Sequence, residues 1–112
     1  MAEGHKVRVL FRVSLGLPFR QASNEERKRV MQLWQETAKK WKSSGVKLVG
    51  YFGADGSALH GFGHHYIFEV DDLSTIREMD ADMFHGELGR YVEDFAFNIG
   101  WSRGTEDWWE SL

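Results

Sequence analysis

The segment from residue 6 to residue 15 alternates between two kinds of side chain. Its even-numbered positions carry Arg8 and Arg12, and its odd-numbered positions are all apolar: Val7, Val9, Phe11, Val13 and Leu15. A period of two with β-branched residues predicts a strand. One face of such a strand must be buried, whereas isolated charges on the other face are costly to bury.

The same alternation returns in residues 62–70 and 95–101, and residues 46–52 predict one more strand. The apolar faces collect Val7, Val9, Phe11, Val13, Phe62, Tyr66, Phe68, Phe95, Phe97, Ile99 and Trp101, and the opposite faces collect Arg8, Arg12, His65, Glu69 and Asn98. We expect the apolar face to meet helices. The opposite face meets either water or another polar sheet, with Arg8 or Arg12 paired to Glu69.

Two helices separate these strands. Ser23 and Glu26 form a capping box, and apolar residues at helical spacing follow over five to six turns: Val30, Leu33, Trp34, Ala38 and Trp41. Gly45 is the expected C-terminal cap of that helix. Asp71 and Asp72 open a second helix near Leu73.

The predicted order is β-α-β-β-α-β, an α+β fold of the ferredoxin-like type. It gives a four-stranded antiparallel sheet with helices on one face. The 112 residues are expected to form one domain over residues 1–112, since the chain shows no repeat or linker.

Charge and composition exclude several function classes. A formal net charge of −3 counts against nucleic-acid binding. The chain has no cysteine, which excludes disulfides and thiolate sites. No apolar run approaches a membrane span, and residues 1–5 do not match a signal peptide. We therefore expect a cytoplasmic protein that binds neither membrane nor nucleic acid.

From residue 6 to residue 101 the chain resembles the dimeric α+β barrel superfamily, in element order, length, long first helix and polar outer sheet face. This superfamily includes antibiotic-biosynthesis and heme-degrading monooxygenases and muconolactone isomerases. The resemblance implies a homodimer or higher homo-oligomer, with a pocket between sheet and helices in each subunit. Residues 102–112, with Trp108 and Trp109, pack either on the partner subunit or on their own domain.

His64 is the first candidate for chemistry. It lies on the apolar strand face, where a histidine is either a satisfied core residue or a pocket residue that acts as acid, base or hydrogen-bond donor. Tyr66 shares its face and is the second candidate catalytic residue. Phe11, Phe62 and Trp101 are the predicted walls of the substrate site.

His85, late in the second helix, is the candidate for cofactor binding. Heme-degrading members of the resembling superfamily use a histidine on this helix as the iron ligand, so the resemblance makes His85 the position to test. The alternative is an ordinary surface histidine. No other metal site is expected, because His60 and His64 would lie about 13 Å apart on a strand.

The leading interpretation is a protein that binds an apolar or aromatic small molecule. As an enzyme it would be a monooxygenase-like or isomerase-like catalyst without a cofactor. One alternative is a heme-binding or heme-degrading protein that uses His85. The other is a non-enzymatic binding or assembly module.

Overall fold

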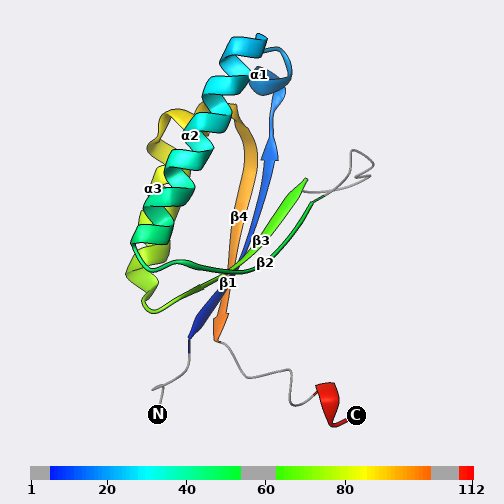
Figure 1. The fold of residues 1–112 in the computed structure, drawn as a ribbon, viewed down its shortest axis with the longest axis vertical. Coiled ribbons are helices and arrows are strands. Elements are labelled where there is room, and N and C mark those ends of the chain that lie inside the picture. Colours follow the sequence, from blue (N-terminus) through cyan, green and yellow to red (C-terminus); the bar gives the residue numbers. More distant parts are fainter. Residues whose placement is uncertain (1–5, 54–62, 102–108) are drawn as a thin grey trace.

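The computed structural model describes residues 6–53, 63–101 and 109–112. The elements in chain order are β1 (Val7–Leu15), α1 (Leu17–Arg20), α2 (Asn24–Ser43), β2 (Lys47–Gly53), β3 (His64–Val70), α3 (Leu73–His85), the 3-10 helix η1 (Glu87–Tyr91) and β4 (Val92–Trp101). Apart from the short helices α1 and η1, this is the predicted order (Figure 1). None of the described helices is long and apolar enough to cross a membrane.

The four strands form one antiparallel sheet in the order β2-β3-β1-β4. The helices α2 and α3 lie on the same face of this sheet (Figure 1). Both connections skip over a neighbouring strand, as in the ferredoxin-like arrangement. The predicted fold class is therefore confirmed.

Phe11, on the central strand β1, is the middle of the core. Its side chain is fully buried, and its ring centroid lies 4.7 Å from Phe97, 5.9 Å from Tyr66 and 5.8 Å from Trp41. Burying a phenylalanine of this kind contributes roughly 1.5–3 kcal/mol by transfer from water. Four of the five odd-numbered residues of β1 are buried, as their alternation predicted, namely Val7, Val9, Phe11 and Val13, whereas Leu15 at the end of the strand is partly buried.

The ends of α2 follow the predicted capping. The Ser23 hydroxyl accepts a hydrogen bond from the Glu26 amide at 3.1 Å, which satisfies one of the free donors at the helix start. Gly45 follows the last turn with φ of +92°, a conformation that L side chains rarely adopt. This residue turns the chain from α2 into β2.

The segment before α2 differs from the prediction. Only two helices were expected from the sequence, but residues 17–20 form an additional one-turn helix, α1, which contains Pro18. Proline is tolerated there because the first amides of a helix have no intrahelical acceptor. The Arg27 side chain donates hydrogen bonds to the Phe19 and Arg20 carbonyl oxygens and ties α1 to α2.

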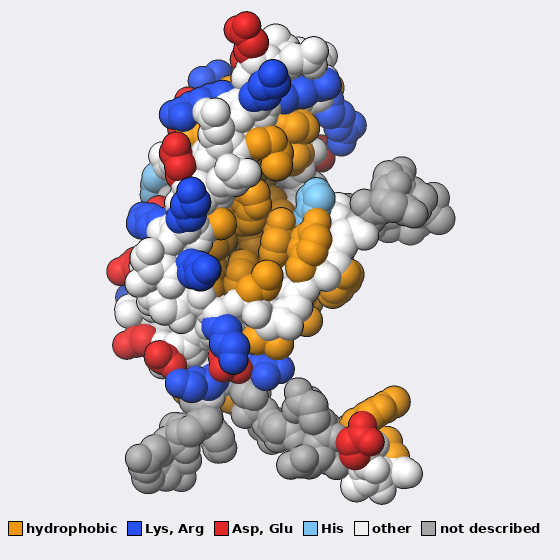
Figure 2. Space-filling model, viewed as in Figure 1, with side chains coloured by type: hydrophobic (Ala, Val, Ile, Leu, Met, Phe, Trp, Pro, Cys, Tyr) orange, Lys and Arg blue, Asp and Glu red, His pale blue; other side chains and the backbone are white. Residues whose placement is uncertain are grey.

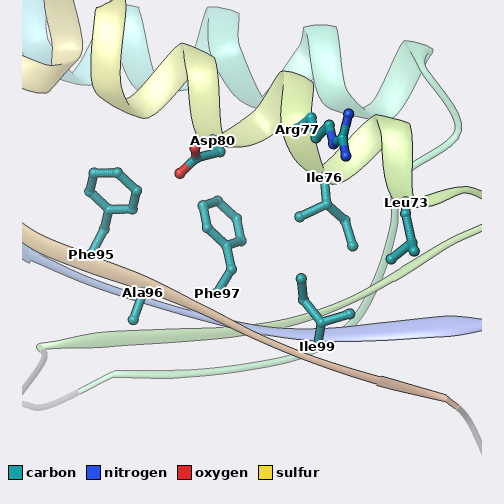
Figure 3. A pocket seen from close by; sticks show the side chains of 8 residues that line it. All are labelled: Leu73, Ile76, Arg77, Asp80, Phe95, Ala96, Phe97 and Ile99. Carbon is teal, nitrogen blue, oxygen red and sulfur yellow. The ribbon is translucent and has the colours of Figure 1, made fainter.

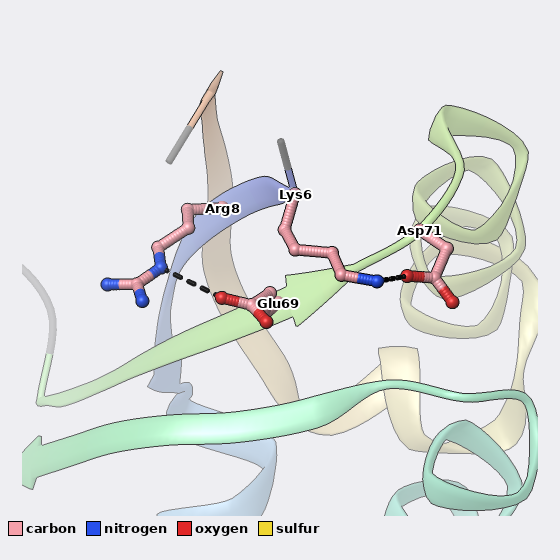
Figure 4. Close-up of polar contacts among 4 residues, drawn as sticks. All are labelled: Lys6, Arg8, Glu69 and Asp71. Atoms are coloured by element: carbon pink, nitrogen blue, oxygen red, sulfur yellow. Dashed lines mark hydrogen bonds and ion pairs between the residues drawn. The ribbon is translucent and has the colours of Figure 1, made fainter. Parts of the chain in front are cut away.

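The face of the sheet away from the helices carries paired charges. Arg8 Nε donates to Glu69 Oε2 at 3.2 Å between β1 and β3, and Lys6 pairs with Asp71 at the end of the same strands (Figure 4). The predicted pairing of an arginine with Glu69 is confirmed for Arg8. His65, also on this face, stacks on Phe52 with ring centroids 4.6 Å apart.

Asp82 joins the two long helices. Its carboxylate accepts a hydrogen bond from the indole nitrogen of buried Trp41 at 2.8 Å and pairs with Lys40 at 2.7 Å. The structure makes Asp82 the polar link between α2 and α3.

Replacing Asp82 should therefore destabilise the fold. Asp82→Ala leaves the Trp41 indole donor unsatisfied, which costs about 1–3 kcal/mol. Urea denaturation measures the loss. The matched control is Asp80→Ala, an exposed carboxylate on the same helix, which should change stability by less than about 0.5 kcal/mol. Equal denaturation midpoints for the two variants would contradict this role of Asp82.

Candidate functional site

A hollow lies between α2 and the sheet, and apolar side chains gather in it (Figure 2). It consists of two adjoining cavities, of about 160 Å³ and about 570 Å³, which share Trp34 and Tyr66 as walls. We call the two together the α2 hollow. The smaller cavity is the histidine compartment and the larger is the lysine compartment, after His64 and Lys42.

The two compartments differ in their linings. The histidine compartment is lined by Val13, Leu15, Val30, Met31, Trp34, Tyr51, His64, Tyr66, Met83, Leu88 and Val92. The lysine compartment is lined by Trp34, Ala38, Trp41, Lys42, Gly45, Val46, Lys47, Leu48, Tyr66 and Phe68. A mostly apolar wall with a few polar groups is typical of a small-molecule site.

A bulge in β2 decides which residues face the hollow. Leu48 pairs with Phe68 but Gly50 pairs with Ile67, so the register shifts at Val49. Such an extra residue reverses the alternation of the strand beyond it. Tyr51 therefore lies opposite Tyr66 on the helix-facing side of the sheet.

Tyr51 holds His64 by a hydrogen bond. The Tyr51 hydroxyl and His64 Nδ1 are 3.0 Å apart, and which of them donates depends on the histidine tautomer. Because Nδ1 is engaged, Nε2 is the ring nitrogen left for a ligand. A histidine fixed in this way can exchange a proton with a bound molecule. Tyr51 was not among the residues predicted for the site, because the residue pattern gives no signal for the bulge.

Tyr66 sits between Tyr51 and Trp34. Its ring centroid is 4.7 Å from that of Tyr51 and 5.4 Å from that of Trp34. Burial raises the pKa of Tyr66 to about 12, Tyr51 adds to the rise, and a hydrogen bond with Trp34 opposes it. At neutral pH the phenol stays protonated and can donate a hydrogen bond.

The structure brings together the two predicted catalytic residues, His64 and Tyr66, in the histidine compartment. Phe11, a predicted wall, is fully buried and lines none of the cavities found among the described residues. Its ring instead packs against two residues that do line the hollow: its centroid lies 5.9 Å from that of Tyr66 and 6.4 Å from that of Trp34. Phe62, another predicted wall, lies outside the described residues.

The prediction that Trp101 stands near His64 is wrong. Both lie on the helix-facing side of the sheet, but Trp101 pairs with Val7 and His64 pairs with Val13. These two positions are six residues apart along β1, a distance of roughly 20 Å. Trp101 is 55% exposed. It does not line the hollow.

His85 lies on the solvent side of α3. It follows the buried Met83 by two residues, or about 200° around the helix. Its side chain is exposed, and its ring contacts that of Phe84 at 5.3 Å between centroids. His85 lines none of the cavities described above. Over the described part of the chain, no three histidine or carboxylate side chains are close enough to hold a metal ion.

A separate cavity of about 450 Å³ lies between α3 and β4 (Figure 3). Phe95, Phe97 and Ile99 of β4 face Ile76 and Leu73 of α3 across it, with Arg77 and Asp80 on the helix side. It contains no histidine or tyrosine. None of the predicted site residues lines this cavity.

No family model and no curated protein sequence matches this chain. Solved structures similar to it include single-substitution variants of chlorite dismutase from Candidatus Nitrospira defluvii. One aligns with a TM-score of 0.73 and 15% identity over 96% of this chain, and a second with a TM-score of 0.71 at the same identity and coverage. This chain spans 44% of each of them, which is less than half their length. Similarity at this identity shows the ferredoxin-like fold alone.

The buried Tyr66 phenol predicts a late tyrosine titration. Its pKa in the folded protein is above the ordinary value of 10, so the folded state holds the proton more tightly than the unfolded state. The associated stability is complete below pH 10 and is lost as the pH rises toward 12. Tyrosinate absorbance should show one component near pH 12 that Tyr66→Phe removes. Tyr91→Phe should leave it in place, and a Tyr66→Phe protein that keeps this component would refute the assignment.

Proposed function

We propose that this protein binds an apolar or aromatic small molecule in the α2 hollow. The observation that carries the proposal is the Tyr51–His64 hydrogen bond at the edge of an aromatic cavity. Trp34 and Tyr66 supply flat walls for a ring system, and His64 supplies the polar contact. A histidine held at Nδ1 by a neighbour is oriented to act through Nε2.

As an enzyme, the protein would be an isomerase or an oxygenase that needs no nucleotide. In both cases His64 Nε2 removes a proton from a carbon next to a carbonyl group of the ligand. The Tyr66 phenol, neutral at physiological pH, donates a hydrogen bond to the negatively charged oxygen that develops. An isomerase then returns the proton to another carbon, whereas in an oxygenase the carbanion reacts with dioxygen.

The test uses 2-naphthol, a fluorescent aromatic with one hydroxyl group. His64→Ala should weaken its binding about 5–10-fold, the cost of one hydrogen bond. The matched control is His65→Ala, because His65 lies on the opposite sheet face and should leave the affinity within twofold. Ala38→Trp fills the lysine compartment and should also weaken binding, while Gln32→Trp, on the exposed side of α2, should not.

Two results would contradict the proposal. Wild-type protein that does not bind 2-naphthol would remove the basis for a small-molecule site. Equal affinities for the His64→Ala and His65→Ala proteins would remove His64 from the site. Circular dichroism of each variant checks that the fold is kept.

The proposal includes a homodimer that forms through the sheet face away from the helices. Leu10 and Ile67 are partly buried apolar residues of that face, beside the Arg8–Glu69 pair. The similar chlorite dismutase chains are more than twice as long, so two copies of this chain match one of them in length. Native mass spectrometry should give twice the 13.0 kDa of one chain. The mass of a single chain would contradict the dimer.

Heme is the second candidate ligand, and the comparisons favour it. The similar structures are chlorite dismutases, which are heme proteins. The exposed position of His85, outside every described cavity, does not fit a ligand for enclosed heme. His64 fits better, since it lines an apolar hollow and Tyr51 orients its ring, as hydrogen-bond partners orient the rings of metal-bound histidines. Bound heme would supply redox and dioxygen chemistry.

Addition of hemin tests this alternative. If heme is a ligand, a Soret band should appear in the wild type and disappear in His64→Ala, while His85→Ala keeps it. Loss of the band in His85→Ala alone would instead support the helix histidine. An unchanged hemin spectrum on mixing with wild-type protein would exclude heme.

A further inference from the structure

We propose that the histidine compartment of the α2 hollow converts neutral aromatic ketones into their enols, with Tyr51 as the middle of a proton relay from His64 to Tyr66. This inference rests on the proposed function, and it names the substrate class, the product and the role of Tyr51. It follows from the order of the three side chains on the sheet and from the uncharged lining around them.

The three side chains follow one another on the helix-facing side of the sheet. His64 and Tyr66 are two residues apart on β3, a distance of roughly 7 Å, and Tyr51 of β2 lies directly opposite Tyr66. The Tyr51 hydroxyl is 3.0 Å from His64 Nδ1, and a side-chain hydrogen bond also joins Tyr51 to Tyr66. Tyr51 therefore connects the two predicted catalytic residues.

The donors and acceptors of this chain allow a proton to pass at each contact. With the proton of neutral His64 on Nδ1, His64 donates to the Tyr51 oxygen, and Tyr51 donates to the Tyr66 oxygen. Trp34, whose indole nitrogen can only donate, also hydrogen-bonds to Tyr66. The Tyr66 O–H group is then available to a ligand, and His64 Nε2 carries no proton and can act as a base.

The lining of the histidine compartment favours a reaction that separates no charge. No aspartate, glutamate, lysine or arginine is among the described residues that line it. An imidazolium and an enolate formed there would lie in mostly apolar surroundings, which is costly. A relay that returns one proton to the ligand as another is removed avoids this cost. The same lining favours a neutral substrate over an acid or an amine.

The reaction moves one proton from carbon to oxygen without a change in oxidation state. His64 Nε2 takes a proton from the carbon next to the carbonyl group, and the electron pair of that C–H bond forms the double bond of the enol. The Nδ1 proton passes to the Tyr51 oxygen, the Tyr51 proton to Tyr66, and the Tyr66 proton to the carbonyl oxygen, which uses its former π electrons for the new bond. His64 ends with its proton on Nε2, and proton exchange with water resets it.

Hydrogen–deuterium exchange of 2-tetralone tests the inference, because this neutral aromatic ketone loses a proton from carbon each time its enol forms. Proton nuclear magnetic resonance in deuterium oxide measures the rate, with the buffer rate subtracted. The wild type should accelerate exchange, and His64→Ala and Tyr66→Phe should each lower kcat about 100-fold. The aromatic alcohol 2-naphthol, which resembles the enol, should inhibit the exchange.

Tyr51→Phe distinguishes a relay from a purely structural role. It should lower kcat about 10-fold or more, because the proton no longer passes to Tyr66, and leave the affinity for 2-naphthol within about twofold. Tyr91→Phe removes a phenol hydroxyl outside the hollow and should change neither quantity. Equal kcat values for the wild type and Tyr51→Phe would overturn the relay.

The tautomer of His64 gives a second, spectroscopic readout. Nitrogen nuclear magnetic resonance of the free wild type should show the proton of neutral His64 on Nδ1, and Tyr51→Phe should reduce the population of that tautomer. A wild-type His64 with its proton on Nε2 would leave no base to face the ligand and would contradict the inference.

Binding and exchange together distinguish this inference from the proposed function. Wild-type protein that binds 2-naphthol but exchanges 2-tetralone no faster than His64→Ala overturns the inference and leaves the binding site in place. Protein that neither binds 2-naphthol nor exchanges 2-tetralone overturns the proposed function, and the inference fails with it. Circular dichroism verifies that each variant is folded.

Discussion

The structure depends on the burial of one face of a four-stranded sheet. Phe11 lies at the centre of that face, and aromatic side chains from α2, β3 and β4 pack around it. Phe11 lies on β1, the strand that pairs with both β3 and β4, so its ring contacts side chains of both neighbouring strands as well as those of α2. Because this cluster is so tightly packed, the walls of the neighbouring hollow are held in place by the core itself.

The hollow is the part of the same face that the helices leave open. Trp34 and Trp41 of α2 stack edge to face, with centroids 5.5 Å apart, and form its inner wall. The polar pair of Tyr51 and His64 lies where the hollow reaches β2 and β3. A site built in this way combines rigid aromatic walls with one histidine that a neighbour orients. Under the proposed function, the same aromatic packing serves both the stability of the fold and the binding of a ligand.

The sequence predicted the element order, the buried face of the sheet and the shared face of His64 and Tyr66, because alternation and helical spacing report which side of an element is buried. It did not predict which face of the sheet Tyr51 occupies, because the bulge in β2 reverses the alternation and nothing in the residue pattern indicates that bulge. Trp101 shows a second limit: alternation gives the face of a residue but not its register along the sheet. For His85, the position 200° from Met83 on the helix already indicated exposure.

The most direct test of the account is nuclear magnetic resonance of the histidine ring nitrogens with and without 2-naphthol. The account predicts that His64 Nε2 shifts on binding, whereas Nδ1, bonded to Tyr51, changes little. His65 and His85 serve as internal controls in the same spectrum and should not move. Binding of 2-naphthol without a shift at His64 would contradict the claim that the α2 hollow is the ligand site.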